Sequence, residues 1–306
     1  MRVLVTGGAG FIGSHIVDAL VDGGHRVSVL DNLSTGRVEN INPATTFYEM
    51  DVRDEAVSRI FSEERPEAVV HMAAQVSVRE SVADPVHDAS VNVMGSINLL
   101  QSCIKYGVGR FVFASSGGAV YGEQETFPAT EAHPTRPLSP YGAAKLAVEH
   151  YLHYYHKEHS LDYTALRYAN VYGPRQDPHG EAGVVAIFTG KMLDGETPTV
   201  NGDGLQTRDY VYVGDVVKAN LLALSKDYVG CLNVGTGVEA TVNQLYGFIK
   251  AEAGYKGDKV HGPAKAGEQF RSVVDCALIK KSFGWSPEVS LPEGLKETVN
   301  YFRAEL

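Results

Sequence analysis

The segment Thr6-Gly7-Gly8-Ala9-Gly10-Phe11-Ile12-Gly13 lies between a short apolar run and a helix-like run, and it decides the fold. Its glycines at 7, 10 and 13 give G-x-x-G-x-x-G, a variant of the fingerprint with which a strand–turn–helix unit binds a dinucleotide. We expect Gly7 to permit the tight turn, Gly10 to let the backbone approach the pyrophosphate, and Gly13 to let the helix pack close to the sheet. The start of the helix would then offer free N–H groups and its positive dipole end to the phosphates. The alternative is a strand-to-helix turn that binds no ligand.

An acidic residue at the end of the second strand-like run supports a cofactor. Asp31 follows residues 26–30 and lies where a carboxylate would bind the ribose hydroxyls of a dinucleotide. Because a carboxylate repels a 2′-phosphate, Asp31 favours NAD over NADP, while Arg37 in the nearby loop would soften that preference. Without a cofactor, Asp31 would simply start the turn at 32–36. Strand, glycines, helix and acid in this order predict NAD.

The first half of the chain alternates strand-like and helix-like runs. Strands are expected at 3–6, 26–30, 68–72 and 110–114, and helices at 11–21 and 92–106. Such alternation is typical of parallel β-α-β units, so we expect an α/β fold with a Rossmann-type doubly wound parallel sheet. After about Asn170 the pattern loosens into short elements. We therefore expect an NAD-binding domain at 1–170, with elements that return around 211–238, and a smaller α/β substrate-binding lobe at 171–210 and 239–306.

The composition is that of a globular enzyme. The 306 residues are 44% hydrophobic and 21% charged, which allows a large core. A net charge of −10 without a basic run argues against a nucleic-acid partner, although a few arginines can bind an anionic substrate. Three widely spaced cysteines favour a reducing compartment, and no apolar run reaches signal-peptide or transmembrane length. We expect a cytoplasmic protein without a membrane partner.

Tyr141 and Lys145 place a phenol and an ammonium group four residues apart. Pro140 favours the start of a helix there, so both side chains would project from one helical face. A nearby ammonium favours the phenolate and would lower the pKa of the tyrosine, and a nicotinamidium charge would act in the same direction. A solvated helix face is the alternative for this spacing alone, but its position after a dinucleotide turn favours a catalytic pair.

Residues at the ends of other strands are also expected to line the ligand-binding crevice at the edge of the sheet. Ser115 and Ser116 end the strand that begins at Arg110, where a hydroxyl would lie at the ligand-binding edge of a parallel sheet. Either serine would otherwise be a polar strand exit before two glycines. Asp51-Val52 would bind the adenine, and 73–75 would leave room for the cofactor backbone, although small residues there often serve packing only.

Together these motifs resemble the extended short-chain dehydrogenase/reductase family, and within it the NAD-dependent epimerase/dehydratase group. TGGAGFIG, DN, AAQ, Asn92, SS, YGAAK and RYANVYGPRQ occur in the family's order, and RDYVYVGDV and FRSVVD extend the likeness into the second lobe. The resemblance implies that Tyr141 is the catalytic base, Lys145 its activator and ribose ligand, and Ser116 the bridging hydroxyl.

The resemblance also implies two sets of binding residues. Those expected to bind NAD are Gly7, Gly10, Phe11, Ile12, Gly13, Asp31, Asn32, Ser34, Gly36, Asp51, Val52, Met72, Ala73, Ala74, Gln75, Asn92, Ala114, Ser115, Tyr141, Lys145 and Tyr168. Those expected to bind a UDP-sugar are Ser77, Ser116, Tyr141, Asn170, Val184, Val185, Thr199, Val200, Asn201, Arg208, Tyr210, Glu268, Arg271 and Ser272. In the second set, Asn170, Arg208 and Arg271 would bind phosphates. Residues 199–201 would lie along the uracil, and Glu268 would bind the uridine ribose.

The residues before the first V-Y-G, at 120–122, reduce the number of reactions that the resemblance allows. Gly118-Ala119 stand where dehydratases of the group carry Asp-Glu, and this turn lacks the serines with which uronate epimerases hold a carboxylate. The expected activity is therefore the interconversion of UDP-galactose and UDP-glucose by 4-epimerisation, through a transient 4-keto sugar and bound NADH.

Several alternatives stay open. Ser272 matches the family's gate position, where a bulky tyrosine excludes N-acetyl groups, so a UDP-N-acetylglucosamine 4-epimerase is one of them. The others are a UDP-glucuronate 4-epimerase, a non-epimerising sugar-nucleotide oxidoreductase, and an NAD-binding sensor, which would often lack the tyrosine or the lysine.

Two helices invite further interpretation. His150, His153, His156 and His159 follow Lys145 at a spacing of three, and we interpret them as a polar helix face and not as a metal site. Family members form dimers, so the resemblance implies a homodimer in which helices at 88–106 and 141–159 pair across a two-fold axis.

Overall fold

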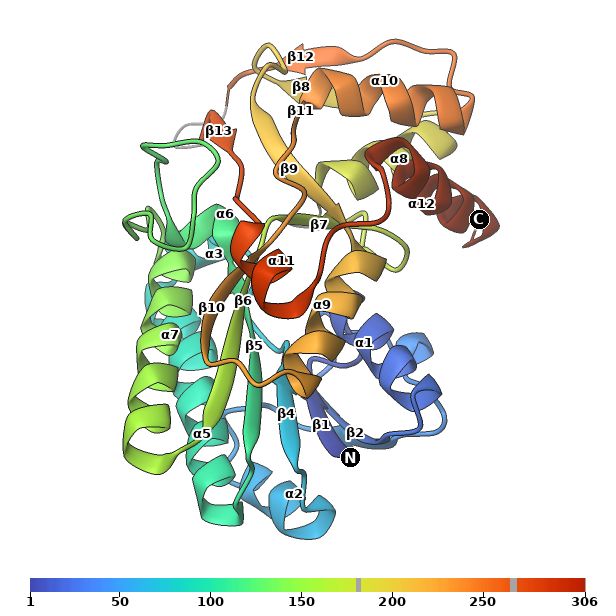
Figure 1. Cartoon of the computed structure of the whole chain (residues 1–306). Coiled ribbons are helices and arrows are strands. Elements are labelled where there is room, and N and C mark those ends of the chain that lie inside the picture. The colour runs from blue at the N-terminus through green and yellow to red at the C-terminus, as the bar shows by residue number, and fades with distance from the viewer. Residues whose placement is uncertain (180–182, 265–268, 306) are drawn as a thin grey trace.

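Seven short strands form one sheet in the order β10-β6-β5-β4-β1-β2-β3, and every neighbouring pair is parallel. The strands are β1 (Arg2–Thr6), β2 (Arg26–Asp31), β3 (Thr46–Glu49), β4 (Ala68–His71), β5 (Arg110–Ser116), β6 (Asp162–Tyr168) and β10 (Gly230–Val234). This computed structural model describes residues 1–179, 183–264 and 269–305 (Figure 1). The expected α/β fold with a doubly wound parallel sheet is confirmed.

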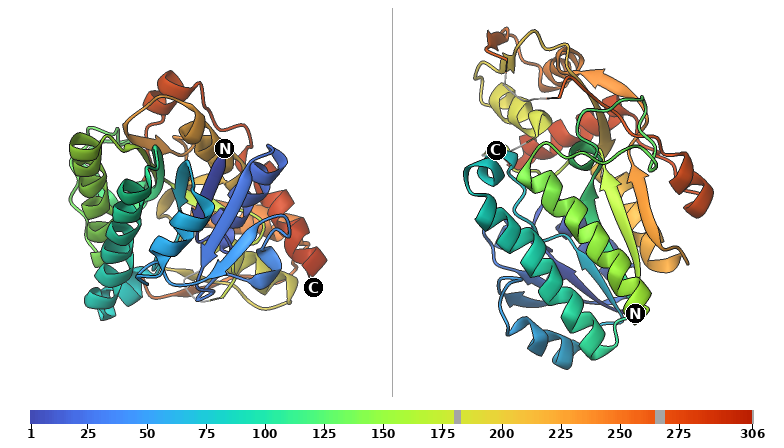
Figure 2. Two further views of the ribbon diagram at one scale, coloured as in Figure 1. Left: turned by 90° about the horizontal axis from the view of Figure 1, so that it is seen from below. Right: turned by 90° about the vertical axis from the view of Figure 1, so that its left-hand side faces the viewer.

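The side-chain alternation of the strands fills a core on each face of this sheet. Val3 and Val5 pack on the side of α1 (Phe11–Asp22) and α9 (Val213–Ser225), whereas Leu4 packs on the opposite side. The helices of that opposite side are α2 (Val57–Glu64), α5 (Gly95–Tyr106) and α7 (Pro140–His159). Figure 2 shows the resulting three layers, with α5 and α7 side by side. Burial on both faces explains why the strands are almost entirely apolar.

The chain order reverses beside β1, which lies between β2 and β4. Ligands of open parallel sheets bind at the carboxyl ends of the strands at such a reversal. The glycine turn, Asp31, residues 72–77 and Ser116 all follow the carboxyl ends of these strands or lie at them, so the fold gathers at one edge the motifs that the sequence separates.

The helix expected at 92–106 begins earlier than the sequence pattern indicated. After α3 (Val78–Ala83), the chain is helical through α4 (Pro85–Ala89), the π-type turn η2 (Ser90–Met94) and α5. Asp84 caps α4, because its side chain accepts a hydrogen bond from the backbone N–H of His87. Two short helices, η1 (Val38–Asn40) and α6 (Gly117–Val120), also belong to this lobe.

A smaller lobe lies above the carboxyl ends of the main strands (Figure 1). Its four-stranded sheet consists of β7 (Asn170–Tyr172), β9 (Thr207–Tyr212), β11 (Glu239–Thr241) and β13 (Arg271–Ser272), and a separate pair consists of β8 (Thr199–Asn201) and β12 (Val260–Gly262). A third apolar core lies among this sheet and α8 (Val184–Leu193), α10 (Val242–Ala253) and α12 (Leu291–Glu305). In the described part of the chain, no helix has the length and apolar character needed to span a membrane.

The chain passes between the lobes more than once. The segment around 211–238 returns to the first lobe, because β10 joins its sheet and α9 packs against α1. The segment at 277–285 also returns to the first lobe. It holds α11 (Ala277–Phe283) and Trp285, whose side chains pack into the core of the first lobe. Trp285 also donates a hydrogen bond to the carbonyl of Asp215 in α9, at 3.0 Å.

Candidate active site

Backbone contacts between β1, α1 and β4 fix the glycine turn. Gly7 has a φ of +68°, and a Cβ at this position would lie 2.5 Å from the backbone nitrogen of Ala73. A Cβ on Gly13 would lie 2.0 Å from the carbonyl oxygen of Gly7. A Cβ on Gly10 would have one described atom within 4 Å, the carbonyl oxygen of Gly7 at 3.3 Å. The first and last glycines therefore serve the turn and the packing, while Gly10 leaves space for a ligand to approach the backbone.

Asp31 lies against this turn in a way that fits a dinucleotide. Its Oδ2 accepts a hydrogen bond from the backbone N–H of Ala9 at 3.0 Å, and its Oδ1 accepts one from Leu33 at 2.9 Å. Carboxylate oxygens keep further lone pairs, which ribose hydroxyls can use. Helix α1 begins after Gly10, which has no side chain to cap the helix, so its first N–H groups are available to a phosphate. The residues present thus fit NAD.

The neighbours of Asp31 change two details of the sequence prediction. The guanidinium of Arg37 pairs with Asp177 at 3.3 Å, so its charge is partly neutralised. Asp51 accepts two side-chain hydrogen bonds from Arg53, each of 2.8 Å, and one from Asn32 of 2.9 Å. The bonds from Arg53 lower the pKa of Asp51 to about 2. An adenine amino group would have to share the Asp51 carboxylate with Arg53 and Asn32.

A buried histidine fixes the exit of β4 beside the glycine turn. One nitrogen of His71 lies 2.7 Å from the hydroxyl of Thr6, and the other lies 2.9 Å from that of Ser96. Burial, and secondarily the charge of Lys145, lower the pKa of His71 to about 3, so the ring is neutral. The Thr6 hydroxyl also accepts the N–H of Ala73 at 3.2 Å. His71 therefore orders the segment that the cofactor backbone would pass.

Tyr141 and Lys145 project from the first turns of α7, as the sequence predicted. Ser139 caps the helix by accepting the N–H of Gly142 at 3.1 Å. The Lys145 ammonium donates to the carbonyl of Ala114 at the end of β5, at 2.9 Å, and lies 5.7 Å from the centroid of the Tyr141 ring. The strand and the helix therefore hold the phenol and the ammonium side by side.

Burial dominates the ionisation of both groups. It raises the pKa of Tyr141 to about 12, together with the charge of Asp88, while the Ser116 hydroxyl acts in the opposite direction. Burial also lowers the pKa of Lys145 to about 8, and the charge of Asp88 opposes that change. The prediction that Lys145 lowers the pKa of Tyr141 is thus wrong for the chain by itself, because the cost of desolvating the phenolate is larger.

The two serines at the end of β5 point in different directions. The hydroxyl of Ser115 donates to Glu149 within the core, at 2.6 Å. Ser116 instead lines a cavity together with Tyr141. Side chains alternate along a strand, so the structure separates a serine of the core from a serine that lines the cavity.

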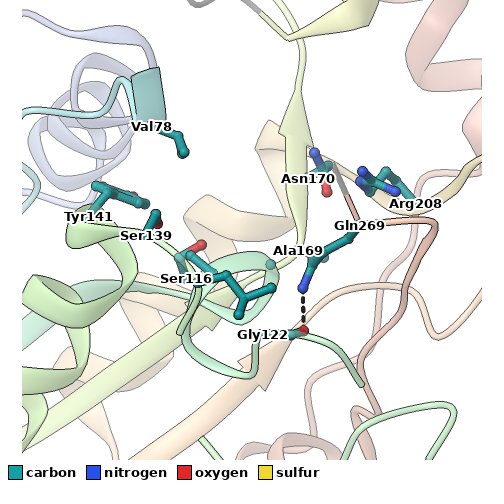
Figure 3. A pocket seen from close by; sticks show the side chains of 12 residues that line it. Val78, Ser116, Gly122, Ser139, Tyr141, Ala169, Asn170, Arg208 and Gln269 are labelled. Atoms are coloured by element: carbon teal, nitrogen blue, oxygen red, sulfur yellow. Dashed lines mark hydrogen bonds between the residues drawn. The ribbon is translucent and has the colours of Figure 1, made fainter. Parts of the chain in front are cut away.

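The cavity has a volume of about 320 Å³ and lies between the two lobes. Its lining residues are Val78, Ser116, Gly118, Ala119, Gly122, Leu138, Ser139, Tyr141, Ala169, Asn170, Arg208 and Gln269. Figure 3 shows Tyr141, Ser139 and Val78 on one side, and Asn170, Arg208 and Gln269 on the other. One end of the cavity is thus lined by apolar and hydroxyl side chains, and the opposite end by a guanidinium and two amides.

Two of the three predicted phosphate ligands lie in this cavity. Asn170 begins β7, and Arg208 on the neighbouring β9 donates to the carbonyl of Thr207 at 2.7 Å. The guanidinium of Arg271 instead makes hydrogen bonds of 3.0 and 2.6 Å to Glu239, and it stacks 3.9 Å from the ring centroid of Phe127. The sequence could not show this pairing, since Glu239 lies on another strand.

Other expected substrate residues lie outside the cavity lining. Tyr210 and Val185 are buried in the core of the smaller lobe, and Val184 begins α8 beside them. Ser272 is buried on β13, in register with Arg208. The segment 199–201 forms β8 and pairs with β12, and Glu268 lies outside the described residues.

The remaining cofactor residues surround the crevice or support it. Phe11 and Ile12 begin α1, while Met72 and Ala74 follow β4 as half-buried residues. The Tyr168 hydroxyl donates to Asn220 at 3.0 Å. Three others act in turns or packing: Ser34 donates its N–H to Asn32, Gly36 packs on Asp31, and Val52 is buried below α5. Ser77, which was expected to bind the UDP-sugar, caps α3.

Four of the residues that sequence reasoning missed show best what the fold brings to the site. Val78, Leu138 and Gln269 line the cavity from three separate segments, and the side-chain amide of Gln269 donates to the Gly122 carbonyl. Asp88 is the fourth, and its charge acts on both Tyr141 and Lys145. No local motif marks any of them, because only tertiary packing brings them together.

The histidines of α7 do not assemble a metal site. Among the described residues, no group of three or more histidine, cysteine, aspartate or glutamate side chains is placed to hold a metal ion. His156 lies 3.3 Å from the carboxylate of Asp162, and His150, His153 and His159 are exposed.

Known proteins resemble the chain along its full length. Residues 3–235 match the NAD dependent epimerase/dehydratase family. A putative UDP-glucose 4-epimerase of Methanocaldococcus jannaschii is 50% identical over 98% of both chains. The structure of UDP-glucose 4-epimerase from Thermotoga maritima with UDP-glucose has a TM-score of 0.98 and 54% identity, and covers 100% of this chain and 99% of its own. The Thermus thermophilus UDP-glucose 4-epimerase complex with NAD has a TM-score of 0.95 and 50% identity, with 100% of both chains covered.

Proposed function

The chain belongs to the NAD-dependent epimerase/dehydratase family, and from this premise we propose that it is a UDP-glucose 4-epimerase, an isomerase that interconverts UDP-galactose and UDP-glucose. One observation carries the proposal: Tyr141 and Ser116 line the same cavity as Asn170 and Arg208, with Lys145 behind the tyrosine. Oxidation of a UDP-sugar at a ring carbon needs a base for the hydroxyl proton and side chains that bind the diphosphate, in addition to a hydride acceptor.

The residues that would hold NAD are the glycine turn, the start of α1 and Asp31. When bound, NAD supplies the hydride acceptor and later the hydride donor for the same carbon. The protein has to keep the cofactor in place through both events. Asp31 and the bare helix start do this by hydrogen bonds and charge, and His71 holds the adjoining segment at 72–77.

Tyr141 is the base in this mechanism. It takes the proton of the sugar C4 hydroxyl, through or beside Ser116, and returns it when the alcohol is re-formed. Burial alone keeps the phenol protonated, since it raises the pKa to about 12. The positive charges of Lys145 and of an oxidised nicotinamide favour the phenolate, so the tyrosine becomes a base only in the assembled complex.

The cavity is built to hold one end of the substrate and to release the other. Arg208 and Asn170 would bind the diphosphate by charge-assisted and amide hydrogen bonds. Part of the cavity wall consists of the small residues Gly118 and Ala119, which leave the 4-keto sugar space to turn about its diphosphate linkage. After turning, the sugar presents its other face and the stereocentre is inverted.

The small wall residues also favour a second substrate class. Gly118 and Ala119 leave room beside the hexose, and Ser272, near Arg208 in the sheet, is small. We therefore include UDP-N-acetylhexosamines among the sugars that the enzyme converts.

Assembly and location extend the proposal. A homodimer would form through the outer face of α5 and α7, where Tyr151 and Tyr154 are 39% and 52% exposed. Cys103, Cys231 and Cys276 are free, which supports a reducing cytoplasm.

The test is to incubate the purified protein separately with UDP-galactose, UDP-N-acetylgalactosamine and UDP-glucuronate, without added NAD, and to resolve the products by chromatography. Formation of UDP-glucose without accumulating NADH is expected, because the cofactor is regenerated in each turnover. Lack of conversion after NAD is added would contradict the proposal. Net formation of NADH would instead indicate an oxidoreductase.

A further inference from the structure

A buried carboxylate lies next to the catalytic pair, and the mechanism above does not use it. Asp88 is on α4, a helix that packs against α7, and it is 1% exposed. Its Oδ1 accepts hydrogen bonds of 2.9 Å from the side chains of both Gln75 and Asn92. Its Oδ2 is buried and has no hydrogen-bond partner among the described residues. A buried carboxylate with one unpaired oxygen is costly, and such groups are often functional.

The two partners of Asp88 hold the segment that follows β4. Asn92 accepts the backbone N–H of Gln75 at 2.9 Å and donates to its carbonyl at 3.0 Å. The side chain of Gln75 also donates to the carbonyl of Ser77 at 2.9 Å. Two residues earlier, Ala73 lies against Gly7 of the glycine turn. Asp88 therefore ties α4 to the segment that borders the expected cofactor site.

The surroundings of Asp88 make its charge important. Tyr141 and Lys145 lie on α7, which packs against α4, and the negative charge of Asp88 raises the pKa of each. His87 is the titratable neighbour on its own helix. The buried His71 on β4 is neutral, and Arg79 and Glu80 on α3 are exposed. The field of Asp88 is thus directed mainly at the phenol and the ammonium.

We propose that Asp88 is a positioning residue of the epimerase: its carboxylate fixes the 73–77 segment through Gln75 and Asn92, and its negative charge keeps Lys145 charged and Tyr141 protonated until a cationic nicotinamide balances it. The proposal rests on the proposed function and deepens it. A neutral, reduced nicotinamide would not balance the carboxylate, so the proton would stay on Tyr141 while the 4-keto sugar turns. Asp88 would thereby couple the protonation of Tyr141 to the charge of the cofactor.

The main test is Asp88→Asn, which keeps an oxygen for Gln75 and Asn92 but removes the charge. The ionisation of Tyr141 is followed with NAD bound, from the ultraviolet absorbance of tyrosinate, after subtraction of the titration of a Tyr141→Phe variant in the same background. The midpoint of Tyr141 should fall by about one pH unit in Asp88→Asn. Asp84→Asn, an exposed cap of the same helix, is the matched control and should leave the midpoint in place. An unchanged midpoint in Asp88→Asn would overturn the electrostatic role.

The positioning role has its own readout. Asp88→Ala removes both hydrogen bonds, so the dissociation constant of NAD, measured by equilibrium dialysis, should rise about tenfold, while Asp88→Asn should stay close to the native value. Unchanged NAD affinity in Asp88→Ala would overturn this role. If Asp88→Asn does not fold, Asp88→Ser removes the charge without added bulk and serves the same comparison. Neither readout needs turnover, so failure to convert UDP-galactose would contradict the proposed function and leave the Asp88 proposal to be decided by its own measurements.

Discussion

The guanidinium of Arg167 on β6 and the carboxylate of Glu149 on α7 form a two-point ion pair, with N–O distances of 2.9 and 2.6 Å. Their side chains are 7% and 4% exposed. Glu149 also accepts the hydroxyl of Ser115, and Arg167 donates to the hydroxyl of Tyr121 at 3.0 Å. Glu149 lies one helical turn beyond Lys145, and Ser115 directly precedes Ser116. The ion pair therefore fixes the helix that carries the base relative to the strand that carries the bridging serine.

Removing one partner of this pair should destabilise the protein strongly. Arg167→Met leaves the Glu149 carboxylate buried without its cation, which typically costs about 3–5 kcal/mol of the free energy of unfolding. Urea unfolding followed by circular dichroism measures the loss. Arg59→Met is the control, because the Arg59–Glu63 pair is on the surface; its unfolding midpoint should not change measurably. Equal midpoints for the two variants would show that the buried pair does not stabilise the fold.

Tyr141→Phe should abolish turnover and spare the cofactor site. Loss of the base should lower kcat for UDP-galactose by at least about a thousandfold, in the range of general acid–base catalysis. The dissociation constant of NAD should stay close to the native value, since the glycine turn, the start of α1 and Asp31, which would hold NAD, are unchanged. Initial rates and equilibrium dialysis measure the two quantities. Tyr154→Phe, at an exposed position of the same helix, should keep full activity; retained activity in Tyr141→Phe would contradict its role as the base.

Local motifs made much of the fold and cofactor site predictable. The glycine turn, Asp31 and the Tyr141–Lys145 spacing each depend on residues close in sequence, and one helical turn or one strand end fixes their geometry. The family resemblance made Ser116 the better of two candidates, and the structure places it in the cavity.

Other features depend on contacts between distant segments and left no signal in the sequence. Arg271 pairs with Glu239, 32 positions away, and the core of the smaller lobe buries Tyr210. Asp88 reaches the catalytic pair only because α4 packs against α7. The direction of the Tyr141 pKa shift was mispredicted for the same reason: spacing along a helix places two charges, but burial, which tertiary packing sets, decides which form is favoured.

The burial of Lys145 should make stability depend on pH in alkaline solution. Its pKa is lowered from 10.5 to about 8 in the folded protein. Between these values the unfolded chain holds a proton that the folded protein has released, so the contribution of Lys145 to the free energy of unfolding rises with pH across this window, by up to ~3 kcal/mol. The difference in unfolding free energy between the native protein and Lys145→Met, measured in urea at several pH values, should show this rise. Lys157→Met, at an exposed position of α7, should show none, and a flat difference for Lys145→Met would contradict the shifted pKa.

Arg208 and Arg271 should differ in their effect on substrate binding, although the sequence suggested the same role for both. Arg208 lines the cavity beside Asn170, whereas the Arg271 guanidinium is paired with Glu239 and covers Phe127. Loss of charge-assisted hydrogen bonds to a diphosphate costs about 1.5–3 kcal/mol, so Arg208→Ala should raise the KM for UDP-galactose and the inhibition constant of UDP by roughly ten- to a hundredfold. Arg271→Ala should change both constants much less, and neither variant should alter NAD affinity. Inhibition by UDP separates diphosphate binding from the chemical step, because UDP has no hexose to oxidise. A larger effect of Arg271→Ala than of Arg208→Ala on this constant would show that Arg271 leaves Glu239 to bind the diphosphate, and would return to it the role that the resemblance implied.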